Sequence, residues 1–341
     1  MTPRTCFSTI LGVLFPTIFL VACNSNPNNP QISELHHLYK EVARTLPSQA
    51  TYSFDIYEQQ IEKIKTYKKI QEEIAKQIPN EYDRPIIELK VFFNHKKQAL
   101  PNIKIGILGG IGPLSDANIM EKLLERLESS NSDHRFMIHL LSMPPPRSLW
   151  EQIKGGLSYI GRLYNFGSLN YENYFLASNT AHLHHGKFSR LVKTSVFHLP
   201  DAVLHRIKQH PMLNKEAKIL VLDTSQANKS RLYQDLFLEQ GITFTNLNKL
   251  HREKLEHWIT KIKASAISSQ ENRQFFLFIS ELCTHYQSKA IILACTEIPL
   301  ALSDYIPRLI ENGIEIVDSE SILIEAIADY LANPKHIKDG H

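Results

Sequence analysis

The sequence lacks the features that would place it among several common functional classes. Its 341 residues include 38 lysines and arginines against 35 aspartates and glutamates, which gives a formal net charge of +3. A nucleic-acid-binding domain normally concentrates basic residues on one face, so this balance gives no reason to expect a nucleic-acid partner. The composition, 43% hydrophobic and 21% charged, is that of a globular protein long enough for two domains.

Cysteine is scarce, and the frequent histidines are not arranged as metal ligands. Cys6, Cys23, Cys283 and Cys295 do not form a disulfide framework, which would be denser and in a shorter chain. The 16 histidines have no set of cysteines or carboxylates beside them, so we expect no metal site. The glycine turn "GGIGP" at 109–113 lacks the G-x-G-x-x-G spacing of a dinucleotide fingerprint, although its backbone N–H groups suit a small anion.

Residues 1–22 have the pattern of a secretory signal peptide. Arg4 supplies a positive charge ahead of an apolar segment that is short for a membrane span. The segment ends in "LVAC", which resembles a bacterial lipobox and makes Cys23 the expected lipidated residue; a plain signal peptide or an uncleaved anchor is the alternative. Residues 23–31 then form a polar, flexible tether. The resemblance to enterobacterial lipoproteins implies that an aspartate after the lipidated cysteine favours retention in the inner membrane. Asn24 is not an aspartate, so we expect an outer-membrane anchor, with the protein facing the periplasm.

Residues 32–100 are expected to form a helical extension. Between Tyr57 and Ile78, apolar residues recur at steps of three and four with lysines and glutamates in the gaps, and Pro79 ends the run. The apolar stripe is expected to pack on the main domain, although the lysines leave a membrane-surface role open. "RPIIELKVFFNHKKQAL", at 84–100, is expected to be a second helix.

From residue 103 onward, short apolar strands alternate with helices. This alternation is typical of βαβ units and indicates an α/β fold with parallel sheets. In such a sheet, the turn after each strand lies at the carboxyl end, where open α/β sheets bind ligands. The turns that could face one cleft are 109–113, 142–147, 178–182, 224–229 and 295–297.

The clearest of these strand ends is "IILACTEIPL" at 291–300. Four apolar residues run directly into Cys295, Thr296 and Glu297. A buried cysteine is often only a small apolar core residue, but the convergence of strand ends favours a functional thiol. Cys283 lies within a predicted helix and is expected to pack in the core.

"GILGGIGP", "SNTAH" and "ACTEIPL", in this order, resemble motifs of the aspartate/glutamate racemase superfamily, and above all those of its aspartate racemase branch. The resemblance covers about 103–330. It implies two pseudo-symmetric, doubly wound parallel-sheet lobes that face each other across a central cleft. Residues 103–210 with 312–333 would form the first lobe, and residues 211–311 the second. Members of this family use no cofactor, and each lobe offers one cysteine to opposite sides of the substrate's α-carbon.

The resemblance gives Cys295 to one face of the substrate and leaves Ser178 where the other cysteine belongs. An α-proton beside a carboxylate is very weakly acidic, so its removal needs a strong base held in place. Surroundings can bring the pKa of a cysteine, ordinarily about 8.5, within reach of neutrality. Inversion needs an acid opposite the base. A serine hydroxyl is a poor base, although it could relay a proton, so we expect one-sided proton transfer.

The substrate-binding residues are also taken from the resemblance. The expected donors around the substrate carboxylate are Gly110, Ile111, Gly112, Asn179, Thr180, Thr224 and Thr296. Arg147, in "SMPPPR", suits a bidentate grip on a side-chain carboxylate, and Lys229 is a second candidate; either could instead be a solvated surface residue. His182 could orient the site or be structural. Ala227 stands where the family commonly has a threonine.

Three functions stay open from the sequence. The leading one is a membrane-tethered, periplasmic racemase-like protein that acts on a small amino dicarboxylate of the aspartate or glutamate type, with a homodimer left open. The second is a single-cysteine decarboxylase or isomerase on the same scaffold. The third is an amino-acid-binding lipoprotein without turnover. Loss of one thiol favours the last two, whereas retention of "ACTEIPL" and Arg147 favours some chemistry.

Overall fold

The computed structural model describes part of the chain. The described residues are 51–57, 65, 67–69, 71–72, 86–93, 103–109, 113–128, 135–142, 166–167, 169–192, 194–210, 213, 218–264 and 267–333. The signal peptide, Cys23 and the tether lie outside these residues, so their assignment stays a prediction.

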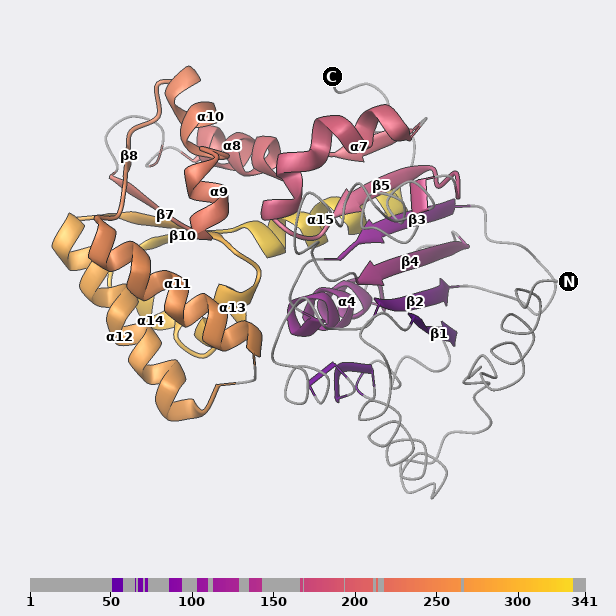
Figure 1. Ribbon diagram of the computed structural model, residues 1–341, viewed down its shortest axis with the longest axis horizontal. Helices are drawn as coiled ribbons and strands as arrows, with labels where there is room; N and C mark the ends of the chain where they lie inside the picture. Colours follow the sequence, from indigo (N-terminus) through magenta and orange to yellow (C-terminus); the bar gives the residue numbers. More distant parts are fainter. Residues whose placement is uncertain are drawn as a thin grey trace, which may run out of the picture.

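Two sheets carry the fold, one in each of two α/β lobes (Figure 1). The first sheet has the order β1 (Thr51–Tyr57), β2 (Ile86–Phe93), β4 (Phe136–Ser142), β3 (Ile103–Leu108), β5 (Asn173–Leu176) and β6 (Ser195–Phe197). The second has the order β10 (Glu315–Asp318), β9 (Ala290–Ala294), β7 (Ile219–Asp223) and β8 (Phe244–Thr245). Every pairing is parallel except that of β2 with β4. The predicted two-lobe α/β fold with parallel sheets is therefore confirmed.

Helices follow the strands in both lobes. The helices of the first part of the chain are α4 (Pro113–Glu128), the 3-10 helix η3 (Thr180–His184), α7 (His185–Leu191) and α8 (Leu199–Gln209). They are followed by α9 (Ser225–Lys229), α10 (Gln234–Glu239), α11 (Lys249–Ala264), α12 (Ser269–Tyr286), α13 (Glu297–Leu302), α14 (Ile306–Glu311) and α15 (Ser319–Ala332). The start of α12 is visible in the sequence, because Ser268 and Glu271 form a reciprocal capping box.

The chain returns to the first lobe later than expected. We placed residues 312–333 in the first lobe, but β10 pairs with β9 in the second sheet, with Val317 opposite Ile292. That boundary is therefore wrong for β10. Helix α15, which begins at Ser319, packs on α4 and α8 of the first lobe, and β10 also contacts α8. Figure 1 shows α15 running between the two sheets. A four-residue strand can pair with either sheet, and only long-range packing chooses between them.

Two strands replace part of the expected helical extension. Ile87, Leu89, Val91 and Phe93 are buried, whereas the residues between them are partly exposed, which is the period of two that a strand requires. The expectation of helices over 51–57 and 86–93 is therefore wrong: both segments are strands that extend the first sheet, and β2 buries one face there. Residues 65, 67–69 and 71–72 are helical, as predicted.

The largest hydrophobic cluster joins the two lobes. It includes buried side chains of β2–β5, α4, α8 and α15, and it continues onto one face of the second sheet through Ile219 and Ile292. Tyr67, from the expected amphipathic helix, is 1% exposed in the same cluster, so this residue packs on the main domain. A second cluster covers the other face of the second sheet with α11 and α12. The two sheets thus share one continuous hydrophobic core, which fixes their relative position.

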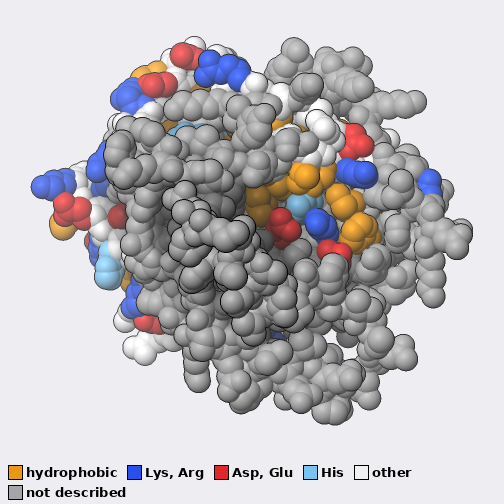
Figure 2. Space-filling model, turned by 45° about the vertical axis from the view of Figure 1, so that its right-hand side comes forward, with side chains coloured by type: hydrophobic (Ala, Val, Ile, Leu, Met, Phe, Trp, Pro, Cys, Tyr) orange, Lys and Arg blue, Asp and Glu red, His pale blue; other side chains and the backbone are white. Residues whose placement is uncertain are grey.

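The described surface offers no membrane-spanning element. Within the residues described, no helix is both long and apolar enough to cross a bilayer. Figure 2 shows hydrophobic side chains on one face, with basic, acidic and histidine side chains among them. The large hydrophobic side chains that are more than half exposed belong to separate segments: Leu169, Leu238, Leu250, Leu277 and Ile310. Single exposed apolar residues of this kind are common on protein surfaces.

Candidate active site

The expected site residues that the structure describes follow the carboxyl ends of strands from both sheets. Ser178, Asn179 and Thr180 come after β5, Thr224 after β7, and Cys295 and Thr296 after β9. Lys229 lies one helix further, at the exposed end of α9. Gly110, Ile111, Gly112 and Arg147 lie outside the described residues, so their substrate contacts stay predictions.

Cys295 sits between a fully buried strand and a short helix. All five residues of β9 are buried, Cys295 is 4% exposed, and α13 begins two residues later at Glu297. The Cys295 thiol donates a hydrogen bond to Glu297 Oε2 at 3.0 Å, and Thr296 Oγ1 lies 3.5 Å from the same oxygen. Glu297 is itself 4% exposed. No role was predicted for Glu297, although its place in "ACTEIPL" was a signal.

The surroundings of Cys295 favour its protonated form. Burial raises the pKa of the Cys295 thiol well above its usual value, and the negative charge of Glu297 raises that pKa further. The ammonium of Lys263 acts in the opposite direction and lowers the pKa of Cys295. The thiol therefore holds its proton at neutral pH. Lys263 belongs to α11 and is partly buried, and nothing in the sequence spacing connected it with Cys295.

Ser178 follows β5 at the end of the first sheet. The ladder continues one residue past the strand, since Ala177 N donates to Leu108 O at 2.8 Å. Ser178 comes next and is partly exposed, and the chain then turns into η3. Among the described residues, no partner is found for its hydroxyl. Ser178 can therefore donate a hydrogen bond or pass on a proton without first breaking a contact within the described structure.

Asn179 connects the two sheets through a buried bridge. Its Nδ2 donates to Ser319 Oγ at 2.9 Å, and Ser319 Oγ donates to Leu293 O in β9 at 2.7 Å. The Tyr233 hydroxyl donates to Asn179 Oδ1. Asn179 is 2% exposed, and Ser319 and Tyr233 are fully buried. Asn179, next to Ser178, is thus linked through the Ser319 side chain to the strand that leads to Cys295. No local sequence pattern marked Ser319 or Tyr233 as site residues.

A second contact between the lobes is formed by two threonines. Thr180 Oγ1 and Thr224 Oγ1 are 3.1 Å apart. Thr224 also caps α9, because its hydroxyl accepts a hydrogen bond from Ala227 N at 3.2 Å. Both threonines were expected near the substrate carboxylate, and the structure brings them together at the seam between η3 and α9.

The first glycine of the glycine turn is required by a close approach of side chains. A Cβ atom at Gly109 would lie 2.7 Å from Asp116 Cγ and 2.9 Å from Ser142 Oγ. Asp116, in the first turn of α4, is fully buried and accepts a hydrogen bond from Ser142 Oγ at the end of β4. Only a residue without a side chain fits at position 109.

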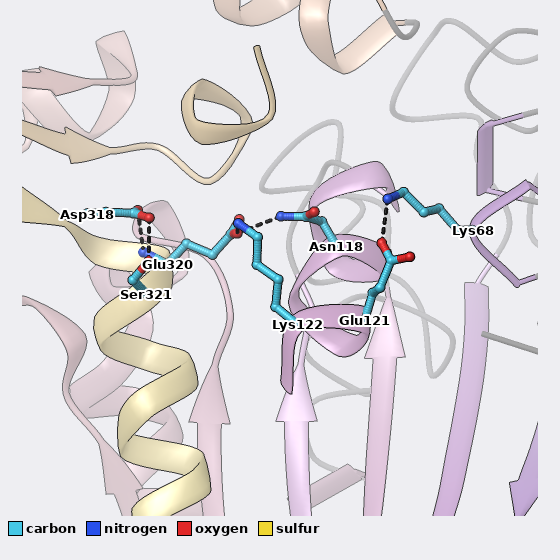
Figure 3. Close-up of polar contacts among 7 residues, drawn as sticks. All are labelled: Lys68, Asn118, Glu121, Lys122, Asp318, Glu320 and Ser321. Atoms are coloured by element: carbon cyan, nitrogen blue, oxygen red, sulfur yellow. Dashed lines mark hydrogen bonds and ion pairs between the residues drawn. The ribbon is translucent and has the colours of Figure 1, made fainter. Parts of the chain in front are cut away.

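A buried carboxylate joins α15 to α4 close to these strand ends. Figure 3 shows Glu320, at the start of α15, reaching Asn118 and Lys122 of α4. The Glu320 carboxylate accepts hydrogen bonds from Asn118 Nδ2 at 2.6 Å and Lys122 Nζ at 2.7 Å. Burial raises the pKa of Glu320 to about 8, against the opposing effect of Lys122. This contact fixes the helix that carries Ser319 to the first lobe.

The remaining candidates have structural surroundings. His182 is 3% exposed and lies 3.2 Å from Leu176 O through Nε2, close to the rings of His185 and His198. No group of three or more His, Cys, Asp or Glu side chains within the described part of the chain is placed to hold a metal ion. Cys283 is a free, buried thiol in the core between α12 and the second sheet, as predicted.

Comparison with known proteins shows which family and which solved structures this chain is similar to. A family model described as Asp/Glu/Hydantoin racemase matches residues 108–327. The Picrophilus torridus aspartate racemase is similar over 67% of this chain and 94% of its own, with a TM-score of 0.52 and 20% identity. An aspartate racemase homologue from Pyrococcus horikoshii OT3 covers 67% of this chain and 99% of its own, with a TM-score of 0.51 and 22% identity. None of the curated proteins matches the chain in sequence.

Proposed function

This chain belongs to the Asp/Glu/hydantoin racemase family, and from that premise we propose that it transfers the α-proton of a small amino dicarboxylate, of the aspartate or glutamate type, without a cofactor. We propose Cys295 as the group that exchanges the proton and Ser178 as its weaker counterpart. The observation that supports this most directly is the buried pair of Cys295 and Glu297 at the end of β9, with Sγ and Oε2 3.0 Å apart.

The pair gives Cys295 a route to its reactive form. The thiol proton moves to Glu297 Oε2, which leaves a thiolate on Cys295. The thiolate then takes the α-proton, so the C–H bond breaks and its electron pair stays on the α-carbon. In the reverse direction the protonated thiol returns a proton to the carbanion. Because Cys295 rests in the protonated form, the second direction needs no prior proton transfer.

The developing negative charge needs fixed donors. Lys263 lies near enough to Cys295 to lower the pKa of the thiol, so its ammonium would also stabilise a carboxylate or carbanion placed beside the sulfur. Thr180 and Thr224 would supply hydroxyl donors from the seam between the lobes, with the substrate carboxylate replacing their mutual contact of 3.1 Å.

Ser178 makes the proposed reaction one-sided. Its hydroxyl proton is held too tightly for Ser178 to start the reaction from its own face, but the hydroxyl can protonate a carbanion that Cys295 has formed. One enantiomer should therefore exchange its α-proton faster than the other, and racemisation should be slow.

The test is α-proton exchange in deuterated water, followed by proton NMR with each enantiomer of aspartate and glutamate in turn. Cys295→Ala should abolish exchange, whereas Cys283→Ala, which removes the other buried thiol of the described chain, should leave it unchanged. Ser178→Cys should raise exchange of the slow enantiomer. Equal rates for both enantiomers in the unaltered protein would contradict the one-sided mechanism, and binding without any exchange would favour a binding protein.

The protonated state of Cys295 also favours the second candidate. A single-thiol decarboxylase or isomerase protonates a carbanion from one face, which is the task that a thiol with a raised pKa performs without activation. Release of carbon dioxide from a small dicarboxylic acid, lost in Cys295→Ala and without racemisation of any amino acid, would identify this reaction.

We further propose that the protein is a lipoprotein anchored through Cys23 to the outer membrane and facing the periplasm. The support is the "LVAC" motif after the apolar segment of residues 1–22. Mass spectrometry of the mature N-terminus should find a lipid-modified cysteine at position 23. An intact Met1, or cleavage at another bond, would contradict the proposal.

A further inference from the structure

We propose that Ser319 and Tyr233 are positioning residues that hold Asn179 as a bridge between the two reacting strand ends, and that the Asn179 side chain is a part of this bridge and not a substrate ligand. The catalytic consequence rests on the proposed function, whereas the structural part is tested separately below. The bridge runs from Tyr233 through Asn179 and Ser319 to Leu293 of β9.

The direction of every hydrogen bond in the bridge is determined. A carbonyl oxygen can only accept, so the Ser319 hydroxyl must donate to Leu293 O. Ser319 Oγ then accepts from the Asn179 amide nitrogen. The Asn179 amide oxygen therefore faces Tyr233, whose hydroxyl donates to it. Reversing the Asn179 amide would place its oxygen against Ser319 Oγ, whose hydrogen is already used, so two acceptors would face each other; the orientation with nitrogen on Ser319 satisfies both contacts.

Burial prevents water from replacing a hydrogen bond of the bridge that is lost. Asn179 is 2% exposed, and Ser319 and Tyr233 are 0% exposed. A buried donor or acceptor that loses its partner has no water to take that partner's place. Because each member satisfies the next, loss of one hydroxyl leaves an unpaired polar group beside a reacting strand end.

The bridge connects the two positions that proton transfer must align. Asn179 directly follows Ser178, and Leu293, in β9, lies two residues before Cys295, which follows the strand. Ser319 stands where the chain passes from β10 of the second sheet to α15 of the first lobe. A shift of Ser319 therefore moves both strand ends relative to each other. Reacting groups need to be held within about 0.5 Å of their productive geometry.

The same contacts leave Asn179 little capacity for a ligand. Its oxygen and one amide hydrogen are engaged, and the side chain is almost fully buried. The resemblance to the racemase motifs had implied substrate binding by Asn179. In this chain, the next residue, Thr180, is partly exposed and has its hydroxyl at the seam.

The test compares two variants of the bridge with two matched controls in the full chain. Ser319→Ala and Tyr233→Phe each remove one hydroxyl from the bridge. Ser288→Ala removes a buried hydroxyl near the opposite end of β9, where it bonds Lys218 O and Ala290 O. Tyr174→Phe removes a buried hydroxyl that bonds Phe166 O and Gly167 O. All four variants lose buried hydrogen bonds, but only the first two touch the bridge.

We expect the bridge variants to lower the α-proton exchange rate at saturating substrate by about ten- to hundred-fold, with KM changed by less than about three-fold, because misalignment by an ångström acts on the chemical step. The controls should stay within about two-fold of the unaltered protein. A bridge variant within that range, or a control with an equal loss, would overturn the catalytic part of the inference.

Amide hydrogen exchange, measured by mass spectrometry, tests the bridge even if no amino acid is turned over. Ser319→Ala and Tyr233→Phe should speed amide exchange by about ten-fold or more both in peptides that cover 177–182 and in peptides that cover 293–298. The two controls should not change exchange in either segment. Failure of turnover in the unaltered protein would reject the proposed function and leave this readout intact. Unchanged amide exchange in both segments, or an equal rise in Ser288→Ala, would reject the bridge.

Discussion

Replacing Glu297 by glutamine should lower the pKa of the Cys295 thiol while it slows α-proton exchange. The thiol donates a hydrogen bond to Glu297 Oε2 at 3.0 Å, and both side chains are 4% exposed. The glutamine keeps the shape and an acceptor oxygen, but it removes the negative charge that opposes a thiolate. Burial still raises the pKa of the thiol, so the pKa should fall without returning to its usual value.

The size of the effect follows from Coulomb's law. Two unit charges about 3 Å apart, in a medium of effective dielectric constant about 20, interact with about 5.5 kcal/mol. One pH unit corresponds to about 1.4 kcal/mol, so this sets an upper limit of about four units on the fall in the pKa of Cys295. Rearrangement of neighbouring dipoles reduces the fall to about one unit or more. Below its pKa, the thiolate fraction of Cys295 would then rise by at least about ten-fold.

Alkylation by iodoacetamide at pH 9, followed by peptide mass spectrometry, measures that fraction. Cys283 is an internal reference in every sample, because burial raises its pKa to about 11 independently of Glu297. The rate for Cys295 relative to Cys283 should rise about ten-fold or more in Glu297→Gln. It should rise far less in the control Glu297→Asp, which keeps the charge. Exchange of the substrate's α-proton should fall in Glu297→Gln, because the group that accepts the thiol proton is gone. An unchanged or lower alkylation ratio would refute the electrostatic argument, and faster substrate exchange would refute the role of Glu297 as proton acceptor.

Three further predictions concern stability. Burial is the main cause of the lowered pKa values of His182 and His185, so below about pH 6.5 the unfolded chain binds protons that the folded chain does not. The unfolding free energy, measured with urea, should therefore fall as the pH falls from 7 to 5. The fall should be less steep in His182→Gln. Burial raises the pKa of Glu320 to about 8, so the unfolding free energy should fall as the pH rises from about 4.5 to 8. Glu320→Gln should raise the unfolding free energy at pH 8 by about 1–3 kcal/mol, because it removes a buried charge. No gain in this variant would contradict the cost of burying the charge. Gly109→Ala should lower the unfolding free energy by about 1–3 kcal/mol at neutral pH, because its Cβ would overlap Asp116, and an unchanged urea midpoint would show that the turn has room.

The N-terminal region shows where local pattern reading went wrong. The segment "IIELKVFF" alternates apolar and polar residues at Ile87, Leu89 and Val91, which is a strand signal. The helix predicted over 84–100 overlooks this period of two. The segment is a strand because β4 offers an edge on which it buries one face, and that partner lies about fifty residues further along the chain.

Only part of the candidate site could be predicted from the sequence. Cys295 and Ser178 were found because their positions after strands are local features, marked by an apolar run that breaks into polar residues. Ser319 carried no such mark, since a serine at the start of a helix is an ordinary capping residue. Its contact with Asn179 joins residues 140 positions apart, and only the packing of α15 against the first lobe creates it.

The sequence by itself determined the alternation of strands and helices from residue 103, the strand ends that carry polar residues, and the single thiol where the resembling family has two. These properties depend on neighbouring residues and on the periods of the backbone. The tertiary structure alone decided which sheet β10 joins, that burial keeps Cys295 protonated, and that Asn179 is hydrogen-bonded to Ser319 and Tyr233. Desolvation, charge partners and buried hydrogen bonds depend on atoms brought together from distant parts of the chain, and no local pattern encodes those distances.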